Sequence, residues 1–415
     1  MALNNSRAPY GIQSPPQHAV ILFYTFYILY TFRRRYLMAN PFKPTAGMTP
    51  PVLIGREDDL EEFEMALDNG VGDLGRLAYV TGPRGIGKTA LLNAYGDIAR
   101  DRKWDVIDET ADQGFLDRLV EALTDTKTKV RSVELPTVRL DLGGTPVGLS
   151  TSLGGISLEP TQRALTFRRA AGQRLDVLEK KNRGLLITLD EVQASDITEL
   201  RALATGMQHL IRERRNVAFV FAGLPSMVED VLNDNVLTFL RRANRTVLSG
   251  IPIPEVHHAF RTIITTNGKQ ASDEVLDTLS ASTRGYPFMI QLVGYWAWAY
   301  TKNSNVITME TTQKAIRRAQ RGLGDMVHAP EIDGLSSMQK EYLLAMAQDD
   351  GPSATAEIAK RLDRDIHYAN VYRTQLIKED VIYSPAWGQV DFKLPYMRDY
   401  LREHGAYHFL HSGTE

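Results

Sequence analysis

The sequence contains no cysteine. This absence excludes disulfide bonds, zinc sites built from thiolates and cysteine nucleophiles, and it agrees with a reducing cytoplasm, where we expect the protein to reside. The chain also lacks a strong charge of either sign, because 48 lysine and arginine residues are matched by 50 aspartate and glutamate residues. A protein that coats nucleic acid carries a strong positive field. Any contact with DNA must therefore be local.

Long apolar runs are scarce. A run of 14 apolar and aromatic residues, 19–32, precedes Arg33, Arg34 and Arg35, but a membrane span needs about 20 residues. A signal peptide would place the basic residues before the run. A short membrane anchor is the alternative. Because Met38 begins a plausible natural start, we expect residues 1–48 to be a disordered leader or a mis-assigned start, and we expect no membrane partner.

The clearest chemical signal is a complete GxxxxGK-S/T phosphate loop between an apolar run and a helix-like stretch. Its residues are Gly82, Pro83, Arg84, Gly85, Ile86, Gly87, Lys88 and Thr89. Glycines let backbone N–H groups turn towards a polyphosphate, the lysine reaches the β and γ phosphates, and the threonine hydroxyl suits Mg²⁺. The loop predicts nucleotide binding.

A second site follows the apolar stretch 184–189, which ends in Asp190 and Glu191. Alone, two carboxylates after a strand are also typical of a helix cap. After a phosphate loop, they predict magnesium-dependent hydrolysis, with Asp190 near the metal bound by Thr89 and Glu191 orienting and deprotonating a water.

Three weaker predictions concern the rest of the site. One prediction is a wall of an adenine pocket formed by Ile54, Gly55 and Arg56. The same residues are equally typical of the entry to a helix with an acidic N-terminus. Pro287 suits either an adenine contact or an ordinary first helical turn. Arg241 and Arg242 suit either an arginine that acts on a neighbouring subunit's γ-phosphate or a pair at a helix C-terminus.

The chain is long enough for two or three domains. Five strand candidates, with helices between them, predict an α/β fold: a three-layer αβα sandwich with a parallel sheet in residues 49–250. Residues 130–158 indicate a β-hairpin insertion. Strand signals stop in residues 251–330, which predicts a helical lid. Residues 331–415 offer three helices and a hairpin, which predicts a winged helix.

In a DNA-binding winged helix, the third helix enters the major groove. Here that helix would present His367, Asn370, Tyr372, Arg373 and Gln375. However, residues 335–405 carry nine lysine and arginine residues against eleven aspartate and glutamate residues, where a DNA-reading domain has a basic face. A protein partner and DNA both stay open as partners of this region.

These motifs together resemble the bacterial AAA-type ATPases of the origin-recognition-like and archaeal-ATPase-like group, which are related to the STAND P-loop NTPases. The resemblance covers residues 50–405. It implies that the phosphate loop is Walker A, that Asp190 and Glu191 are Walker B, and that Arg241 or Arg242 is an arginine finger or sensor. It also implies that Pro287 belongs to a lid motif that contacts the base.

One departure is that the strand candidate 217–222 leads into Gly223, where many AAA proteins carry a polar sensor. Slow hydrolysis would follow, which suits a switch better than a motor. We therefore expect an ATPase that uses ATP and Mg²⁺ to move the lid and winged helix and so controls a partner or DNA. The alternatives are an ATP-dependent DNA-binding regulator and a non-hydrolysing signalling scaffold. A homo-oligomer is expected if the arginine acts in trans.

Overall fold

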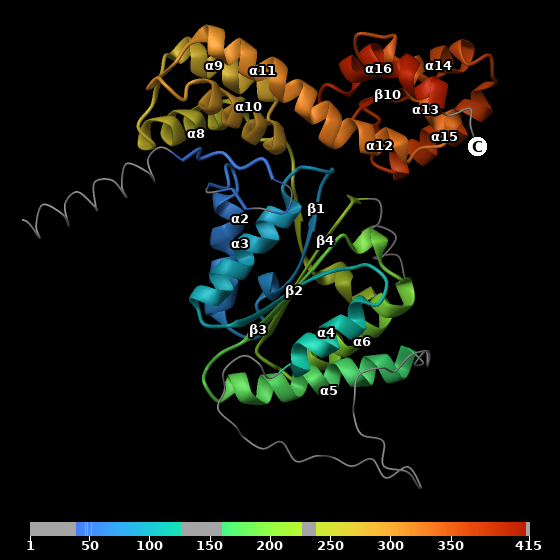
Figure 1. Cartoon of the computed structure of the whole chain (residues 1–415). Coiled ribbons are helices and arrows are strands. Elements are labelled where there is room, and N and C mark those ends of the chain that lie inside the picture. Colours follow the sequence, from blue (N-terminus) through green and yellow to red (C-terminus); the bar gives the residue numbers. More distant parts are fainter. Residues whose placement is uncertain are drawn as a thin grey trace, which may run out of the picture.

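A computed structural model describes residues 39–45, 47, 49–50, 52–125, 160–225 and 238–411. Residues 1–38 of the expected leader, the expected hairpin at 130–158 and most of the helix expected before Arg241 lie outside the described residues, whereas residues 39–45 and 47 of that leader are described. Figure 1 shows a central sheet with helices on both sides, below one helical group coloured gold and another coloured red.

The central sheet is parallel throughout and has the strand order β2-β3-β4-β1-β5. Its strands are β1 (Leu77–Thr81), β2 (Asp105–Thr110), β3 (Leu185–Asp190), β4 (Val217–Gly223) and β5 (Asn244–Val247). In parallel strands the carboxyl ends share one edge, so the phosphate loop after β1, Asp190 at the end of β3 and Gly223 at the end of β4 are neighbours. All seven residues of β4 are buried.

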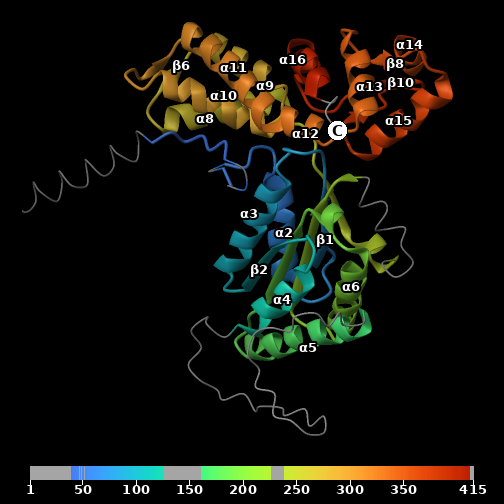
Figure 2. The ribbon, with the colours of Figure 1, turned by 45° about the vertical axis from the view of Figure 1, so that its right-hand side comes forward.

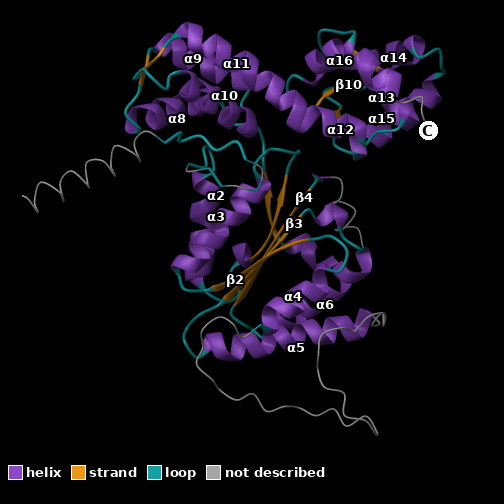
Figure 3. Ribbon diagram, viewed as in Figure 1, coloured by secondary structure: helices purple, strands orange, loops and turns teal. Residues whose placement is uncertain are grey.

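Helices cover both faces of this sheet, which confirms the predicted three-layer α/β sandwich (Figure 3). They are α2 (Glu57–Asn69) and α3 (Lys88–Asp101) on one face, and α4 (Phe115–Thr124), α5 (Pro160–Glu179) and α6 (Ile197–Arg212) on the other. Alternate residues of β4 face opposite sides, as the period of a strand requires: Val220 packs with the α2 and α3 core, and Phe219 with the α4 to α6 core. Helix α4 was not predicted.

The lid is helical, as expected, except for a two-stranded parallel pair, β6 (Gln270–Ala271) with β7 (Val306–Ile307). Its helices are α8 (Ile253–Thr266), α9 (Asp273–Thr283), α10 (Pro287–Tyr300) and α11 (Met309–Leu323). A π-helical turn, Gly324–His328, and a short helix, α12 (Ala329–Asp333), lead out of α11. The lid shares one continuous hydrophobic core with α2 and α3.

The C-terminal region follows α12 and packs beside the lid (Figure 2). It contains α13 (Ser337–Ala347), β8 (Ser353–Ala354), α14 (Thr355–Arg361), α15 (Ile366–Lys378), β9 (Ile382–Tyr383), β10 (Gln389–Phe392) and α16 (Met397–His411). The sheet order is β8-β10-β9 with antiparallel pairing. The three helices and the hairpin were expected, whereas β8 and α16 were not. Its assignment as a winged helix and the domain limits stay predictions.

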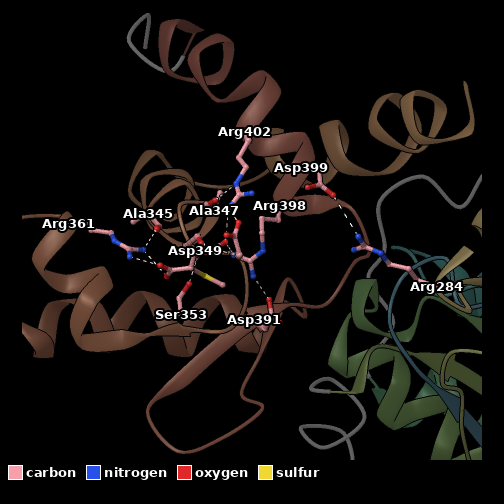
Figure 4. Close-up of polar contacts among 12 residues, drawn as sticks. Arg284, Ala345, Ala347, Asp349, Ser353, Arg361, Asp391, Arg398, Asp399 and Arg402 are labelled. Atoms are coloured by element: carbon pink, nitrogen blue, oxygen red, sulfur yellow. Dashed lines mark hydrogen bonds and ion pairs between the residues drawn. The ribbon is translucent and has the colours of Figure 1, made fainter. Parts of the chain in front are cut away.

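Arginines tie the C-terminal region together around the end of α13 (Figure 4). Arg361 pairs with Asp349 at 2.5 Å, Arg398 with Asp391 at 2.6 Å and Arg402 with Asp350 at 2.8 Å. Arg398 and Arg402 also donate to carbonyl groups at the C-terminus of α13, whose partial negative charge favours cations. The basic side chains of this network are thus used to fold the region.

Among the described residues, no helix is both long enough and apolar enough to cross a membrane.

Candidate nucleotide site

The phosphate loop links the end of β1 to the start of α3. Gly87 immediately precedes α3 with φ of 99°, a left-handed conformation that glycine adopts without strain. No atom lies within 4 Å of the position that its Cβ would occupy. The loop therefore presents open backbone to the pocket at the positive end of a helix, which is where a phosphate binds.

Lys88 lies beneath this loop and is only 6% exposed. Its Nζ donates to the carbonyl oxygens of Gly82 at 2.9 Å and Pro83 at 3.1 Å. Burial lowers the pKa of Lys88, while the carboxylates of Glu191 and Asp190 act in the opposite direction. The ammonium group is thus held at the loop by weak neutral acceptors that phosphate oxygens can replace.

Thr89 and Asp190 meet across the sheet edge, where the Thr89 hydroxyl donates to Asp190 Oδ2 at 2.5 Å. Two hard oxygen ligands at one point fit Mg²⁺, which takes few protein ligands and completes its shell with water and phosphate oxygens. In the part of the chain that the structure describes, no three acidic or histidine side chains are grouped to hold a metal by themselves. Thr89 and Asp190 are therefore the residues that would hold Mg²⁺.

Glu191 follows Asp190 in a left-handed conformation, with φ of 56°. Its side chain is exposed and lines the same pocket as Lys88 and Thr89. Gln193 Nε2 donates to Glu191 Oε2. The structure therefore brings together four residues predicted from the two motifs: Lys88, Thr89, Asp190 and Glu191.

The pocket has a volume of about 780 Å³. Of the predicted adenine wall, Ile54, Arg56 and Pro287 line it. Gly55 lies behind them, where a Cβ would stand 2.7 Å from Glu255 Oε2. Sequence reasoning missed the remaining apolar lining, which includes Pro44, Ile251, Phe288, Ile290 and Met326.

One wall of this pocket is the N-terminal strap, by which we mean the described residues between 39 and 50. The backbone N–H of Lys43 donates to Gln291 Oε1 at 2.9 Å, and Asn40 donates to the carbonyl of Tyr295 at 3.0 Å. Phe42 is buried against α10. Sequence reasoning placed residues 39–48 in the expected leader and did not predict that this segment would bind the lid.

The phosphate loop also touches two elements that are distant in sequence. The Tyr286 hydroxyl, just before α10, donates to the carbonyl oxygen of Arg84 at 2.9 Å. Arg84 Nη1 lies 2.9 Å from Glu331 Oε2 in α12. Burial raises the pKa of Tyr286, so the hydroxyl keeps its proton and donates. Neither contact could be predicted from spacing.

Arg241 and Arg242 lie away from the phosphate loop of their own chain. They end a short 3-10 helix just before β5, whose first residue pairs with Ala78 near the amino end of β1. The phosphate loop leaves the opposite, carboxyl end of β1. Both side chains are exposed, so action on a phosphate would need a second copy of the chain.

Comparisons with known proteins agree with this geometry. Residues 52–220 match the AAA ATPase domain model, and residues 325–401 match a domain of unknown function (DUF8462). No curated protein shows significant similarity to the chain.

Among solved structures, a Walker-type ATPase of Pyrococcus abyssi is similar, with 14% identity, a TM-score of 0.61 and coverage of 88% of this chain and 99% of that one. The ORC2 protein of Aeropyrum pernix, solved in ADPNP and ADP complexes, has 14% identity and a TM-score of 0.60, with coverage of 90% of this chain and 98% of that one. At this identity the likeness concerns the fold. The match to the AAA ATPase domain model thus covers residues 52–220, and the chain shares the fold of these two solved proteins.

Proposed function

We propose that this protein binds and hydrolyses ATP with Mg²⁺ and that its nucleotide state sets the position of the lid and the C-terminal region. One observation carries the proposal: residue 84 of the phosphate loop contacts Tyr286 before α10 and Glu331 in α12. Any shift of the loop on binding phosphate therefore alters its contacts with both the lid and the link to the C-terminal region.

The proposed chemistry is attack of water on the γ-phosphorus. Glu191 accepts a proton from the water as the new O–P bond forms, and the bond between the γ-phosphorus and the β,γ-bridging oxygen breaks, so that ADP and phosphate are released. Lys88 moves from the carbonyls of Gly82 and Pro83 to the phosphate oxygens. Mg²⁺ held by Thr89 and Asp190 would neutralise phosphate charge.

The C-terminal region also acts on the loop through charge. Burial lowers the pKa of Lys88, and Asp380, between α15 and β9, is one of the carboxylates whose negative charge opposes this change. A bound polyphosphate brings several negative charges to the same place, and like charges repel. Lys393, which pairs with Asp380, reduces this repulsion, so the contacts of Arg84 carry the proposal.

Two substitutions test the activity. Lys88→Ala is expected to abolish measurable ATP binding, whereas Glu191→Gln is expected to keep binding and to lower kcat by about 100-fold or more, because a general base contributes that much. Isothermal titration with ATP and Mg²⁺, and phosphate release, measure the two effects. Lys180→Ala, an exposed lysine beyond α5, is the control. Unchanged affinity and turnover in Lys88→Ala would refute the proposal.

The charges of the C-terminal region give less support to DNA binding through α15 than to binding of a protein partner. Of the nine lysine and arginine residues counted in residues 335–405, five form ion pairs within the region: Lys360, Arg361, Lys393, Arg398 and Arg402. Phosphate contacts dominate affinity for DNA and need unpaired cations. We therefore propose a protein as the controlled partner. Cytoplasmic location and oligomerisation stay predictions.

A further inference from the structure

Strand β4 brings no polar side chain to the catalytic edge of the sheet. It ends in Phe221, Ala222 and Gly223, beside the ends of β1 and β3. A polar group is nevertheless present there, because Gln193 reaches the end of β4 from the turn after β3. Its Oε1 accepts from the backbone N–H of Leu224 at 3.2 Å.

The backbone after β3 turns sharply so that this side chain comes back towards the site. Glu191 is left-handed, and a 3-10 turn, Val192–Ala194, follows at once. Val192 is buried and anchors the turn. Gln193, which is half-buried, then donates from Nε2 to Glu191 Oε2. A single amide group thus joins the proposed base to the neighbouring strand.

An amide side chain satisfies both partners. The carboxylate of Glu191 needs a donor, and the N–H of Leu224 needs an acceptor, so the oxygen and nitrogen of Gln193 have one consistent orientation. A second carboxylate here would repel Glu191, and an apolar side chain would leave the N–H of Leu224 without this acceptor and would no longer fix the exposed carboxylate of Glu191.

Gly223 provides the room that Gln193 occupies. A Cβ at position 223 would lie 3.2 Å from Gln193 Oε1 and 3.5 Å from the Cβ of Val192. The absence of a side chain at Gly223 in β4 therefore leaves the space that the amide of Gln193 fills from the turn.

We propose that Gln193 is a positioning residue for hydrolysis: it fixes the carboxylate of Glu191 relative to the end of β4. Gln193 does not line the nucleotide pocket, whereas Glu191 does, so Gln193 acts through Glu191. The inference rests on the proposed ATPase activity. It is an alternative to the expectation of slow hydrolysis that followed from the apolar end of β4, which stays a prediction.

Gln193→Leu is expected to lower kcat by about 10- to 100-fold, because a misplaced base loses rate of that order, while KM for ATP changes by less than about twofold. Gln208→Leu, an exposed glutamine on α6, is the matched control. Steady-state phosphate release measures both. Unchanged or increased kcat in Gln193→Leu would overturn the inference and leave the proposed function intact, whereas absence of turnover in the wild type would refute the proposed function itself.

Two further variants separate positioning from folding. Gln193→Glu places a like charge beside Glu191 and should lower kcat as Gln193→Leu does, with little change in Tm. Gly223→Ala keeps Gln193 but crowds its amide and should lower kcat in the same way with little change in Tm. If neither effect appears in these folded variants, Gln193 has no positioning role.

Discussion

His328 lies in the π-helical turn between α11 and α12 and is 1% exposed. Its Nε2–H donates to the carbonyl oxygen of Pro395 at 3.0 Å, and its ring packs against Tyr400. Nδ1 is buried without a hydrogen-bond partner. Protonation would place a buried N–H on Nδ1 that has no acceptor, and burial accordingly lowers the pKa of His328 to about 4.

This histidine makes stability depend on pH. Between pH 6.5 and pH 4 the unfolded chain binds a proton at residue 328 that the folded chain does not, so the free energy of unfolding falls as pH falls through this window. The loss reaches about 3 kcal/mol at pH 4. His328→Gln keeps a donor for Pro395 but does not titrate, and urea unfolding at pH 7 and pH 4.5 should show a smaller difference. Equal differences in both proteins would contradict this assignment.

The sequence predicted individual residues where chemistry fixes their spacing. Lys88 and Thr89 follow from the loop motif, and Asp190 and Glu191 follow from a buried strand that ends in acids. Gln193, Tyr286 and Glu331 could not be predicted, because each acts through a contact that depends on how separate elements pack. In hindsight, Gly223 together with a glutamine two positions after Glu191 is the only sequence signal for Gln193.

The strap and α10 illustrate how elements build the pocket. Phe42 is 1% exposed and packs at 5.7 Å from the ring of Phe260. A Cβ on Gly294 of α10 would lie 2.3 Å from the Phe42 ring, so glycine at this position lets the strap approach the helix. The strap is therefore held by the Phe42 anchor together with the hydrogen bonds of Asn40 and Lys43, while its later residues line the nucleotide pocket.

Phe42→Ala should detach the strap, which forms one wall of the nucleotide pocket. The truncation removes burial that is worth about 3–5 kcal/mol in protein cores, and detachment of the strap should weaken ATP binding by at least about tenfold. Titration calorimetry with ATP measures the affinity, and Leu74→Ala, an exposed leucine, controls for loss of apolar surface. Unchanged affinity in Phe42→Ala would show that the strap adds nothing to nucleotide binding.

Elements were predictable in proportion to their length and patterning. The apolar stretches 184–189 and 217–222 were placed within one residue of β3 and β4. The strands β6, β7 and β8 have two residues each, too few to show a period, and they exist because tertiary contacts pair them. Helix α16 was missed because its mixed sequence shows no clear apolar face.

The three parts of the molecule meet at the phosphate loop. Glu331 is 7% exposed at its side chain, whereas its partner Arg84 is 55% exposed. Burial raises the pKa of Glu331, and Arg84 opposes this change. Two more contacts join the lid to the C-terminal region: the Tyr396 hydroxyl donates to the carbonyl of Ser282 at 2.7 Å, and Arg284 stacks over the ring of Tyr396 at 4.0 Å.

Glu331→Gln removes the charge that holds Arg84 and should favour the arrangement that ATP induces. Small-angle X-ray scattering of the nucleotide-free variant should then move towards the curve of wild type with ATP and Mg²⁺. Glu357→Gln, which breaks an exposed ion pair with Lys360, should scatter like wild type. If Glu331→Gln matches nucleotide-free wild type and responds equally to ATP, the Arg84–Glu331 pair does not hold the resting arrangement.

The approach of Tyr286 to the phosphate loop has a consequence for sequence divergence. A Cβ on Gly85 would lie 1.9 Å from the Tyr286 hydroxyl oxygen, and Gly85 also has φ of 67°. Two positions about two hundred residues apart therefore share one small volume. In homologous chains a larger residue at position 85 should appear only where position 286 has lost its tyrosine, and the same covariation should link position 223 to position 193.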